Sequence, residues 1–314
     1  MELLKILTMC FAPSGREENV REFIKSEAGK YADEIYEDTL GNLIVRKGRG
    51  GKKIAILAHM DEIGVVVTYK DEKGFLKFAP VGGLKTKDLV GRRVIFQNGT
   101  VGVIGVCDDA DKYEISKMFI DVSGNEDVAV GDMAVFTGDF CENETHIISK
   151  ALDNRAGCYV ALKTLQTVES DKELYFIFTV QEEVGLRGAK TATYGIEADY
   201  AVAVDVTMVG DTPGAKEMNV KLGGGAAIKV MDRSVICHSQ VRDALIDIAS
   251  KNNIQYQLEI LTAGGTDAGA AHISGNGIKT GAISIPTRYI HSPSEMINKQ
   301  DLKACIELLK EYIK

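Results

Sequence analysis

Hydrophobic and polar positions along the chain follow two different periods, and the dominant period changes along the sequence. In the first 63 residues, apolar positions at helical spacing follow Ser14-Gly15-Arg16-Glu17 and predict an amphipathic helix, which Ser14 and Glu17 would begin as a capping box. Two apolar runs at residues 42–45 and 54–57 predict strands, and the second run suits a buried position in a sheet. This region therefore combines helix and strand.

Between residues 64 and 149 the pattern changes to short strands separated by turns. Turn signals such as Asp71-Glu72-Lys73-Gly74 and Asn98-Gly99 divide the segments, and no long helical period interrupts them. This texture predicts a small all-β module of barrel or sandwich type. Its predicted strands are residues 64–69, 75–81, 93–97, 101–106, 119–122 and 133–137.

After Lys150, strands and helices alternate again. Such alternation predicts an α/β fold in which a mainly parallel sheet is sandwiched by helices. We therefore expect one α/β domain formed by residues 1–63 and 150–314, with residues 64–149 inserted as a small barrel-like all-β domain. The predicted elements are helices at 154–168, 188–194, 239–250 and 299–313 and strands at 174–180, 200–206 and 281–285.

Composition restricts the classes of partner. The 314 residues include 45 acidic and 37 basic side chains, a formal net charge of −8. This balance argues against nucleic acid or an anionic membrane as the main partner, because both bind basic surfaces. No segment approaches the roughly 18 apolar residues of a membrane span. None of the six cysteines forms a C-x-x-C pair, so we expect no thiolate metal site and a reducing, cytoplasmic location.

Potential metal ligands lie where strands of the predicted α/β domain end, which is where functional groups gather in such sheets. Alternation along an extended chain puts His59 and Asp61 on the same side. Taken singly, these motifs have simpler interpretations: a surface turn for His59 and Asp61, a helix cap for Asp153 and a loop residue for His291. Asp205 is harder to explain this way, because a carboxylate in an apolar strand is costly without a partner.

Two adjacent carboxylates, Glu182 and Glu183, follow the apolar strand at 174–180 and would repel each other without a compensating cation. Together the motifs supply two histidines and up to five carboxylates, a set without thiolates that suits Zn²⁺, Co²⁺ or Mn²⁺. One catalytic zinc keeps about three protein ligands and an open position. Two ions that share a carboxylate would leave another carboxylate free as a general base, as two-metal hydrolysis requires.

These motifs, in this order, resemble those of the dinuclear-metal aminopeptidases of the tetrahedral (TET) type. That family includes glutamyl and deblocking aminopeptidases, and some members are labelled endoglucanases. It has a zinc-peptidase-like α/β fold. The resemblance covers nearly the whole chain, through residues 58–64, 150–155, 181–185, 264–268 and 286–292.

The resemblance implies a role for each residue of the candidate site. Asp153, followed by a cis peptide bond, would bridge two divalent ions per subunit, zinc or cobalt, with manganese as a further candidate. Glu182 would act as general base, taking a proton from the attacking water and passing it to the leaving amine, while Asp61 orients His59. Glu183 and His291 would complete one ion site, and His59 and Asp205 the other.

The resemblance also implies the substrate and the assembly. Gly265, Thr266 and Asp267 would lie in a substrate-pocket loop, although their composition alone indicates only a flexible turn. The inserted domain would mediate dimerisation, and the dimers would assemble into a hollow tetrahedral dodecamer. The expected function is a metal-dependent aminopeptidase that hydrolyses N-terminal residues from peptides.

Two alternatives stay open. A dinuclear deacylase or carboxypeptidase would use the same water chemistry on another amide. A non-catalytic metal-binding assembly protein is a second alternative, although Glu182 argues against it because a purely structural site needs no spare carboxylate. The sequence does not choose among glutamyl, leucyl and lysyl preference.

Overall fold

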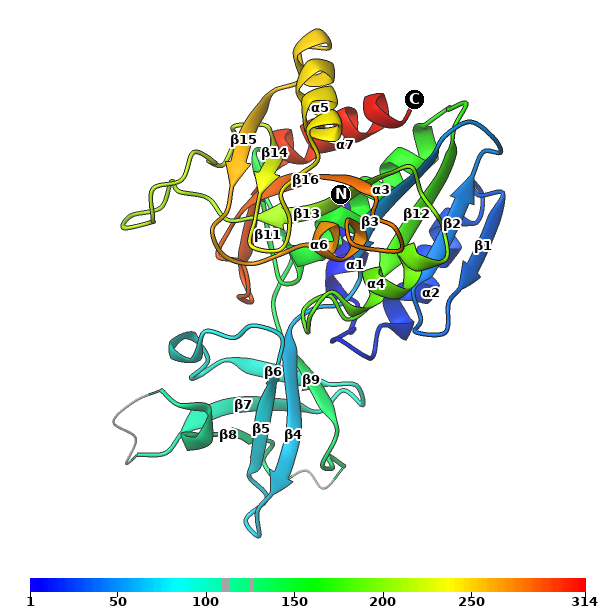
Figure 1. Ribbon diagram of the computed structural model, residues 1–314. Helices are drawn as coiled ribbons and strands as arrows, with labels where there is room; N and C mark the ends of the chain where they lie inside the picture. Colours follow the sequence, from blue (N-terminus) through cyan, green and yellow to red (C-terminus); the bar gives the residue numbers. More distant parts are fainter. Residues whose placement is uncertain (109–112, 125–126) are drawn as a thin grey trace.

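The computed structural model describes residues 1–108, 113–124 and 127–314. Figure 1 shows a body built on a large sheet covered by helices, with a smaller β-barrel beside it. The large sheet has 11 strands, and the barrel is closed by six. The predicted fold class, an α/β sheet sandwiched by helices with an inserted barrel-like β domain, is confirmed.

Parallel strands form the centre of the large sheet, and its outer strands pair mostly antiparallel. The parallel neighbours are, in order, β12 (Glu173–Thr179), β3 (Lys53–His59), β13 (Tyr200–Thr207) and β16 (Lys279–Arg288). The outer strands are β1 (Glu34–Glu37) and β2 (Leu43–Lys47) beyond β12, and β17 (Glu295–Asn298), β11 (His146–Ser149) and β10 (Cys141–Glu142) beyond β16. Two further strands, β14 (Ala226–Met231) and β15 (Tyr256–Ile260), pair with each other in parallel, and β14 also joins β16 antiparallel.

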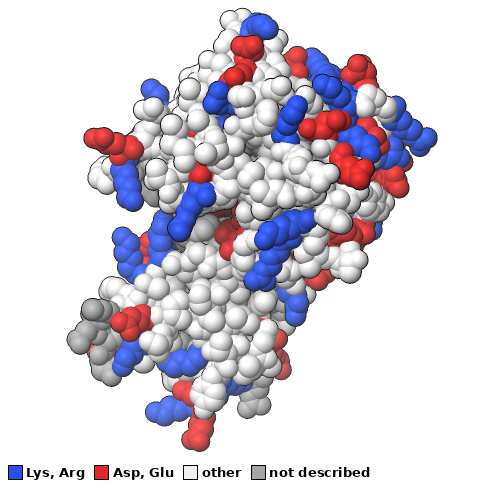
Figure 2. Space-filling model, in the orientation of Figure 1, with Lys and Arg blue, Asp and Glu red and all other residues white. Residues whose placement is uncertain are grey.

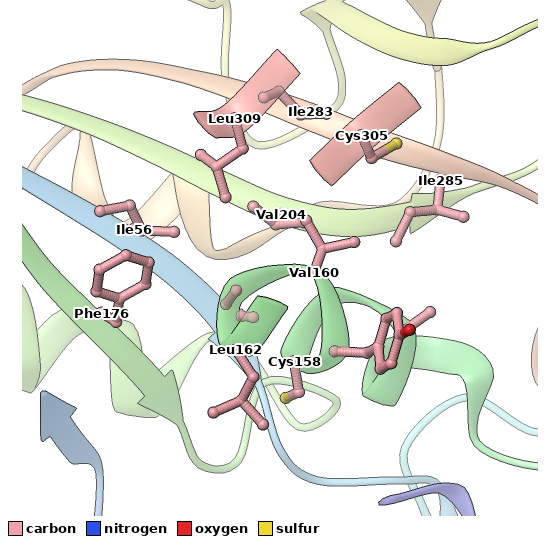
Figure 3. Packing of buried hydrophobic residues seen from close by; sticks show 14 of the residues in the cluster. Ile56, Cys158, Val160, Leu162, Phe176, Val204, Ile283, Ile285, Cys305 and Leu309 are labelled. Atoms are coloured by element: carbon pink, nitrogen blue, oxygen red, sulfur yellow. The ribbon is translucent and has the colours of Figure 1, made fainter. Parts of the chain in front are cut away.

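Helices cover both faces of this sheet. One face carries α1 (Glu2–Met9), α2 (Glu18–Ala28), α3 (Leu152–Thr167), α5 (Ser239–Lys251) and α7 (Lys299–Ile313), whose apolar residues join one large core cluster. The other face carries α4 (Arg187–Tyr194) and α6 (Asp267–Ala271). Figure 3 shows Val160 of α3 beside Val204 of β13, with Leu309 of α7 near Ile283 of β16. This packing holds the carboxyl ends of the central strands in place.

The barrel has its own apolar core, separate from the core clusters of the large sheet. Its strands are β4 (Gly64–Lys70), β5 (Leu76–Val81), β6 (Arg93–Phe96), β7 (Val101–Val106), β8 (Met118–Asp121) and β9 (Met133–Phe136), and the short 3₁₀ helices η1 (Thr86–Asp88) and η2 (Ile115–Lys117) connect some of them. The predicted insert of residues 64–149 extends beyond this barrel, because β10 and β11 pair with each other and β11 pairs with β17 of the large sheet. The division into catalytic and dimerisation domains stays a prediction.

The predicted capping box at Ser14 and Glu17 is wrong. Glu17 itself is the N-cap of α2 and makes no side-chain cap hydrogen bond there. Ser14 instead donates from Oγ to Oδ2 of Asp61 at 2.6 Å. The buried, charged acceptor on Asp61 competes successfully with the helix N-terminus for this hydroxyl, because hydrogen bonds to ionised groups are stronger than neutral ones.

Within the described ranges, no helix is long and apolar enough to cross a membrane. All six cysteines are free thiols, and three of them are buried. The cytoplasmic location stays a prediction.

Candidate metal centre

Segments at the ends of strands in the large sheet bring histidines and carboxylates to the wall of one cavity of about 370 Å³. The carboxyl ends of neighbouring parallel strands meet at one edge of a sheet, so residues distant in sequence come together there. Figure 2 shows acidic atoms in the hollow between the two bodies of the molecule. The titratable side chains that line the cavity are His59, Asp153, Glu182, Glu183, Asp205 and His291.

The carboxylate of Asp153 lies between the two histidines. Its Oδ1 is 3.1 Å from Nε2 of His59, and its Oδ2 is 3.3 Å from Nε2 of His291. Asp205 lies beside His59, with Oδ1 3.6 Å from His59 Nε2. Glu183 lies beside His291, with Oε2 3.1 Å from His291 Nε2. These are the groupings that the family resemblance implies for two ions sharing Asp153, and the roles of the residues as ligands stay a prediction.

Local backbone geometry directs Asp153 into the cavity. The Asp153–Asn154 peptide bond is cis, as the family resemblance implies. Asp153 has φ −78° and ψ 105° within the first turn of α3, so its carboxylate faces the histidines and does not cap the helix. The side chain of Asn154 donates to Val204 O at 2.8 Å and accepts from Gly157 N at 3.0 Å, which anchors this turn to β13.

Asp61 connects His59 to the turn that carries the two adjacent glutamates. Its Oδ1 lies 3.5 Å from Nδ1 of His59 and accepts from Glu182 N at 3.0 Å, while Oδ2 accepts from Glu183 N at 3.2 Å. Burial opposes ionisation, but the hydrogen bonds from His59 and Ser14 hold the pKa of Asp61 below its ordinary value. Asp61 therefore sets the positions of three neighbouring residues without lining the cavity itself.

The site carries more buried negative charge than its histidines neutralise. Burial raises the pKa values of Glu182, Glu183 and Asp205, and repulsion from neighbouring carboxylates adds to the effect. Burial lowers the pKa of each histidine, but the surrounding carboxylates outweigh it, and the pKa of His291 rises to about 11. Bound cations would relieve this repulsion, because buried charges need opposite charges or metals close by.

Among the described residues, two sets of three side chains place their donor atoms within 4.8 Å of one another. His59 and Asp153 combine with Glu183 in one set, and His59 and Asp205 combine with Glu182 in the other. Imidazole and carboxylate donors without thiolates suit Zn²⁺, Co²⁺ or Mn²⁺. This donor chemistry fits the divalent ions that the sequence implies, but the two sets differ from the implied ligand groups, because neither contains His291 and the second contains Glu182.

The predicted pocket loop is only partly at the cavity. Gly265 lines it, together with Gly264. Thr266 and Asp267 are each 2 % exposed and lie at the start of α6, where Asp267 accepts a hydrogen bond from the hydroxyl of Thr179 at the end of β12. Their predicted contact with substrate stays a prediction, and their burial indicates support of the loop instead.

Sequence reasoning missed two carboxylates that hold the site together. Glu295, 2 % exposed, accepts from the backbone N–H groups of Asp153 and His291, both at 2.9 Å. Glu17 accepts from Gln181 N at 3.0 Å, and burial raises its pKa to about 7. Glu295 follows the candidate ligand His291 by only four residues, and this proximity could have indicated a supporting role. Glu17 was interpreted as part of a helix cap, so its hydrogen bond to the turn at Gln181 was not expected.

The apolar part of the cavity wall was also missed, since isolated leucines and methionines carry no chemical signal in a sequence. It is formed by Leu186, Met208 and Leu261, together with Val206 and Ile290. These residues follow different elements of the fold, so only the folded chain brings them together.

Comparisons with known proteins agree with this geometry. The family model for M42 glutamyl aminopeptidase matches residues 41–308. A putative aminopeptidase of Acetivibrio thermocellus is 52 % identical, and the match covers 99 % of this chain and 98 % of the relative. A glutamyl aminopeptidase of Lactococcus lactis subsp. cremoris is 31 % identical, and the match covers 99 % of this chain and 94 % of the relative.

Solved structures of similar proteins share the whole fold. An aminopeptidase from the archaeon Desulfurococcus kamchatkensis superposes with a TM-score of 0.95 at 40 % identity, covering 99 % of this chain and 93 % of its own. The TET1 peptidase of Pyrococcus horikoshii superposes with a TM-score of 0.87 at 35 % identity, covering 99 % of this chain and 98 % of its own. That peptidase is described as able to assemble into a tetrahedron or a large octahedral shell.

Proposed function

This chain belongs to the M42 glutamyl aminopeptidase family, and we propose that its centre removes N-terminal residues from peptides with two divalent ions and Glu182 as general base. Family membership and the named aminopeptidase relatives make the chain a metal-dependent aminopeptidase. The observation that carries the two-ion proposal is the position of Asp153, whose two oxygens face two different histidines.

In this proposal Asp153 is shared, His59 and Asp205 hold one ion, and His291 and Glu183 hold the other. The donor set favours zinc or cobalt and also suits manganese. Two bound ions would lower the pKa of a water molecule and polarise the scissile carbonyl.

Glu182 is the carboxylate that this assignment leaves free. Its Oε2 lies 3.8 Å from His59 Nε2, farther than the oxygens of Asp153 or Asp205. A carboxylate beside the reacting atoms can take a proton from the attacking water and deliver it to the leaving amine. Burial raises the pKa of Glu182, which makes its carboxylate a stronger base toward the attacking water. Asp61 accepts a hydrogen bond from the backbone N–H of Glu182 and so positions Glu182.

We also propose that the barrel mediates dimerisation and that dimers assemble into a tetrahedral dodecamer. The support is the similarity over nearly the full length of both chains to a peptidase that can form a tetrahedron or an octahedral shell. Native mass spectrometry distinguishes the two outcomes, since a mass of twelve subunits supports the proposal and a dimer or a larger shell contradicts it.

A substitution of the general base tests the mechanism. Glu182→Gln should bind two ions per chain, measured by elemental analysis, but lose about 10²- to 10⁴-fold in kcat on aminoacyl reporter peptides. The exposed residue Glu169 provides the matched control, Glu169→Gln, which should keep full activity. A Glu182→Gln protein with two ions and full activity would contradict the role of Glu182.

Chelation and substrate chemistry test the reaction class. Activity should disappear with a chelator and return with Zn²⁺ or Co²⁺. An aminoacyl substrate with a free amine should be hydrolysed, whereas its N-acetyl analogue should not. Faster hydrolysis of the acetylated compound would instead indicate a deacylase.

A further inference from the structure

We propose that the cavity beside the metal centre selects peptides with an aliphatic N-terminal residue, such as leucine or methionine, over peptides that begin with glutamate or lysine. This inference rests on the proposed function, because it assigns the substrate class of the same site. It is carried by the composition of the cavity lining, in which apolar side chains accompany the titratable side chains of the metal centre.

The largest apolar side chains of the lining come from three separate segments. Leu186 precedes α4, Met208 follows β13, and Leu261 follows β15, and all three line the cavity. Met208 is 45 % exposed, although it is a large apolar side chain next to a buried, charged centre. Exposed apolar surface inside a concave site is typical of ligand contact, and methionine adapts readily to the shape of an aliphatic partner.

Every charged or titratable side chain among the described lining residues belongs to the metal centre. A substrate glutamate would therefore face carboxylates, and a substrate lysine would compete with the ions for them. Placing an unpaired charge against an apolar wall is unfavourable. The hydroxyl of Thr207, which also lines the cavity, already donates to Glu259 at 2.8 Å.

Charged groups near the wall have partners within the protein. Lys229 pairs with Glu259 and lies 3.5 Å from Asp232, and all three side chains are fully buried. Lys85 donates from Nζ to the backbone oxygen of Ile290 at 3.2 Å. None of these four charged residues lines the cavity, so aliphatic contact is the chemistry that the lining side chains outside the metal centre offer.

Two competing preferences are worth testing directly. Basic side chains flank the hollow in Figure 2, which would favour a glutamyl substrate if they reached it. The buried cluster of Lys229, Asp232 and Glu259 has one more acidic than basic group, which would favour a lysyl substrate if the wall opened. The apolar lining favours neither.

The test uses initial rates of the metal-loaded enzyme on reporter substrates that differ only in the N-terminal residue. We expect kcat/KM for leucine and methionine to exceed that for glutamate and lysine by at least about tenfold, and to exceed that for alanine by about tenfold or more, since missing methylenes weaken contact with an apolar pocket. A glutamyl or lysyl substrate cleaved as well as leucine would overturn the proposal. Loss of hydrolysis on every substrate would instead contradict the proposed function.

Charge substitutions in the wall give a second readout. Met208→Lys should raise the glutamyl-to-leucyl ratio of kcat/KM by at least about tenfold, and Met208→Glu should raise the lysyl-to-leucyl ratio similarly, because each supplies a counter-ion. Tyr194, 74 % exposed at the end of α4 and outside the cavity, provides the control Tyr194→Lys, which should leave the ratios unchanged. Unchanged ratios in folded Met208 variants would overturn the proposal.

Binding without turnover covers the case in which the variants do not fold. Free leucine should raise the melting temperature of the metal-loaded wild-type enzyme more than equal concentrations of glutamate or lysine. An equal or greater effect of either charged amino acid would overturn the aliphatic assignment.

Discussion

Glu295 shows how one buried carboxylate can set the geometry of a metal centre without lining its cavity. Its two oxygens accept from the backbone N–H groups of Asp153 and His291. In the proposed site, Asp153 binds both ions and His291 binds one of them. Glu295 therefore joins the start of α3 to the loop after β16. Outer partners of this kind commonly matter almost as much as the ligands.

Replacing Glu295 with glutamine should weaken metal binding by about 10- to 100-fold. The amide keeps one acceptor oxygen but turns an N–H₂ donor toward the second backbone N–H, leaving a buried donor without a partner. Titration against a competing chelator measures the affinity. The exposed control Glu169→Gln should bind metal as tightly as the wild-type protein, and an unchanged affinity in Glu295→Gln would exclude the positioning role.

Helix α3 approaches β13 so closely that one of its positions requires glycine. A Cβ atom on Gly157 would lie 2.3 Å from Asn154 Oδ1 and 2.5 Å from Val204 O. Both atoms belong to the hydrogen bonds that anchor the turn carrying Asp153. The close approach of the helix thus supports the site directly.

Gly157→Ala should destabilise the protein by about 1–3 kcal/mol through overpacking, despite the higher helix propensity of alanine. Chemical denaturation measures this change. Gly195→Ala is the matched control, because a Cβ there would meet nothing within 4 Å. Equal stability of the two variants would mean that α3 can shift away from β13 at little cost.

The barrel provides a second prediction at the level of elements. Ile120 of β8 is fully buried in its core, whereas Val103 of the neighbouring β7 is 43 % exposed. Ile120→Ala should cost about 2–5 kcal/mol, and Val103→Ala should change stability by at most about 0.5 kcal/mol.

If the barrel is an independent domain, calorimetry of Ile120→Ala should show a separate transition at lower temperature, with metal affinity unchanged. A single transition that shifts as a whole, together with weaker metal binding, would argue against the proposed division into domains.

For the whole molecule, metal binding and stability should be linked through the buried acidic centre. Removing the ions would leave carboxylates whose pKa values burial already raises, in a site with too little positive charge. An ion present at 100 times its dissociation constant stabilises the folded state by about 2.7 kcal/mol. The melting temperature should therefore fall on chelation and recover with added Zn²⁺.

Two variants separate this effect from catalysis. Glu182→Gln should show the same shift on chelation, because the proposed ligands are intact, whereas His59→Ala should show a smaller one. A melting temperature that does not change while both ions are lost would contradict the linkage.

The sequence by itself determined the type of most elements and the chemistry of the centre. Helical and strand periods are properties of neighbouring residues, so the helix at 299–313 and the six barrel strands were predictable to within about two residues at most ends. The family motifs predicted the groupings of His59, Asp205, His291 and Glu183 around Asp153, which the distances match.

Tertiary structure alone decided which groups support the centre and which form its apolar wall. Ser14 donates a hydrogen bond to Asp61 and does not cap its own helix. Glu295 accepts from the backbone N–H groups of two distant segments, and Met208 and Leu261 line the same cavity. The strands β14, β15 and β17 and the short α6 were also not predicted from local patterns. The physical reason is common to all of them: these contacts join segments far apart in the chain, and their geometry depends on how strands and helices pack.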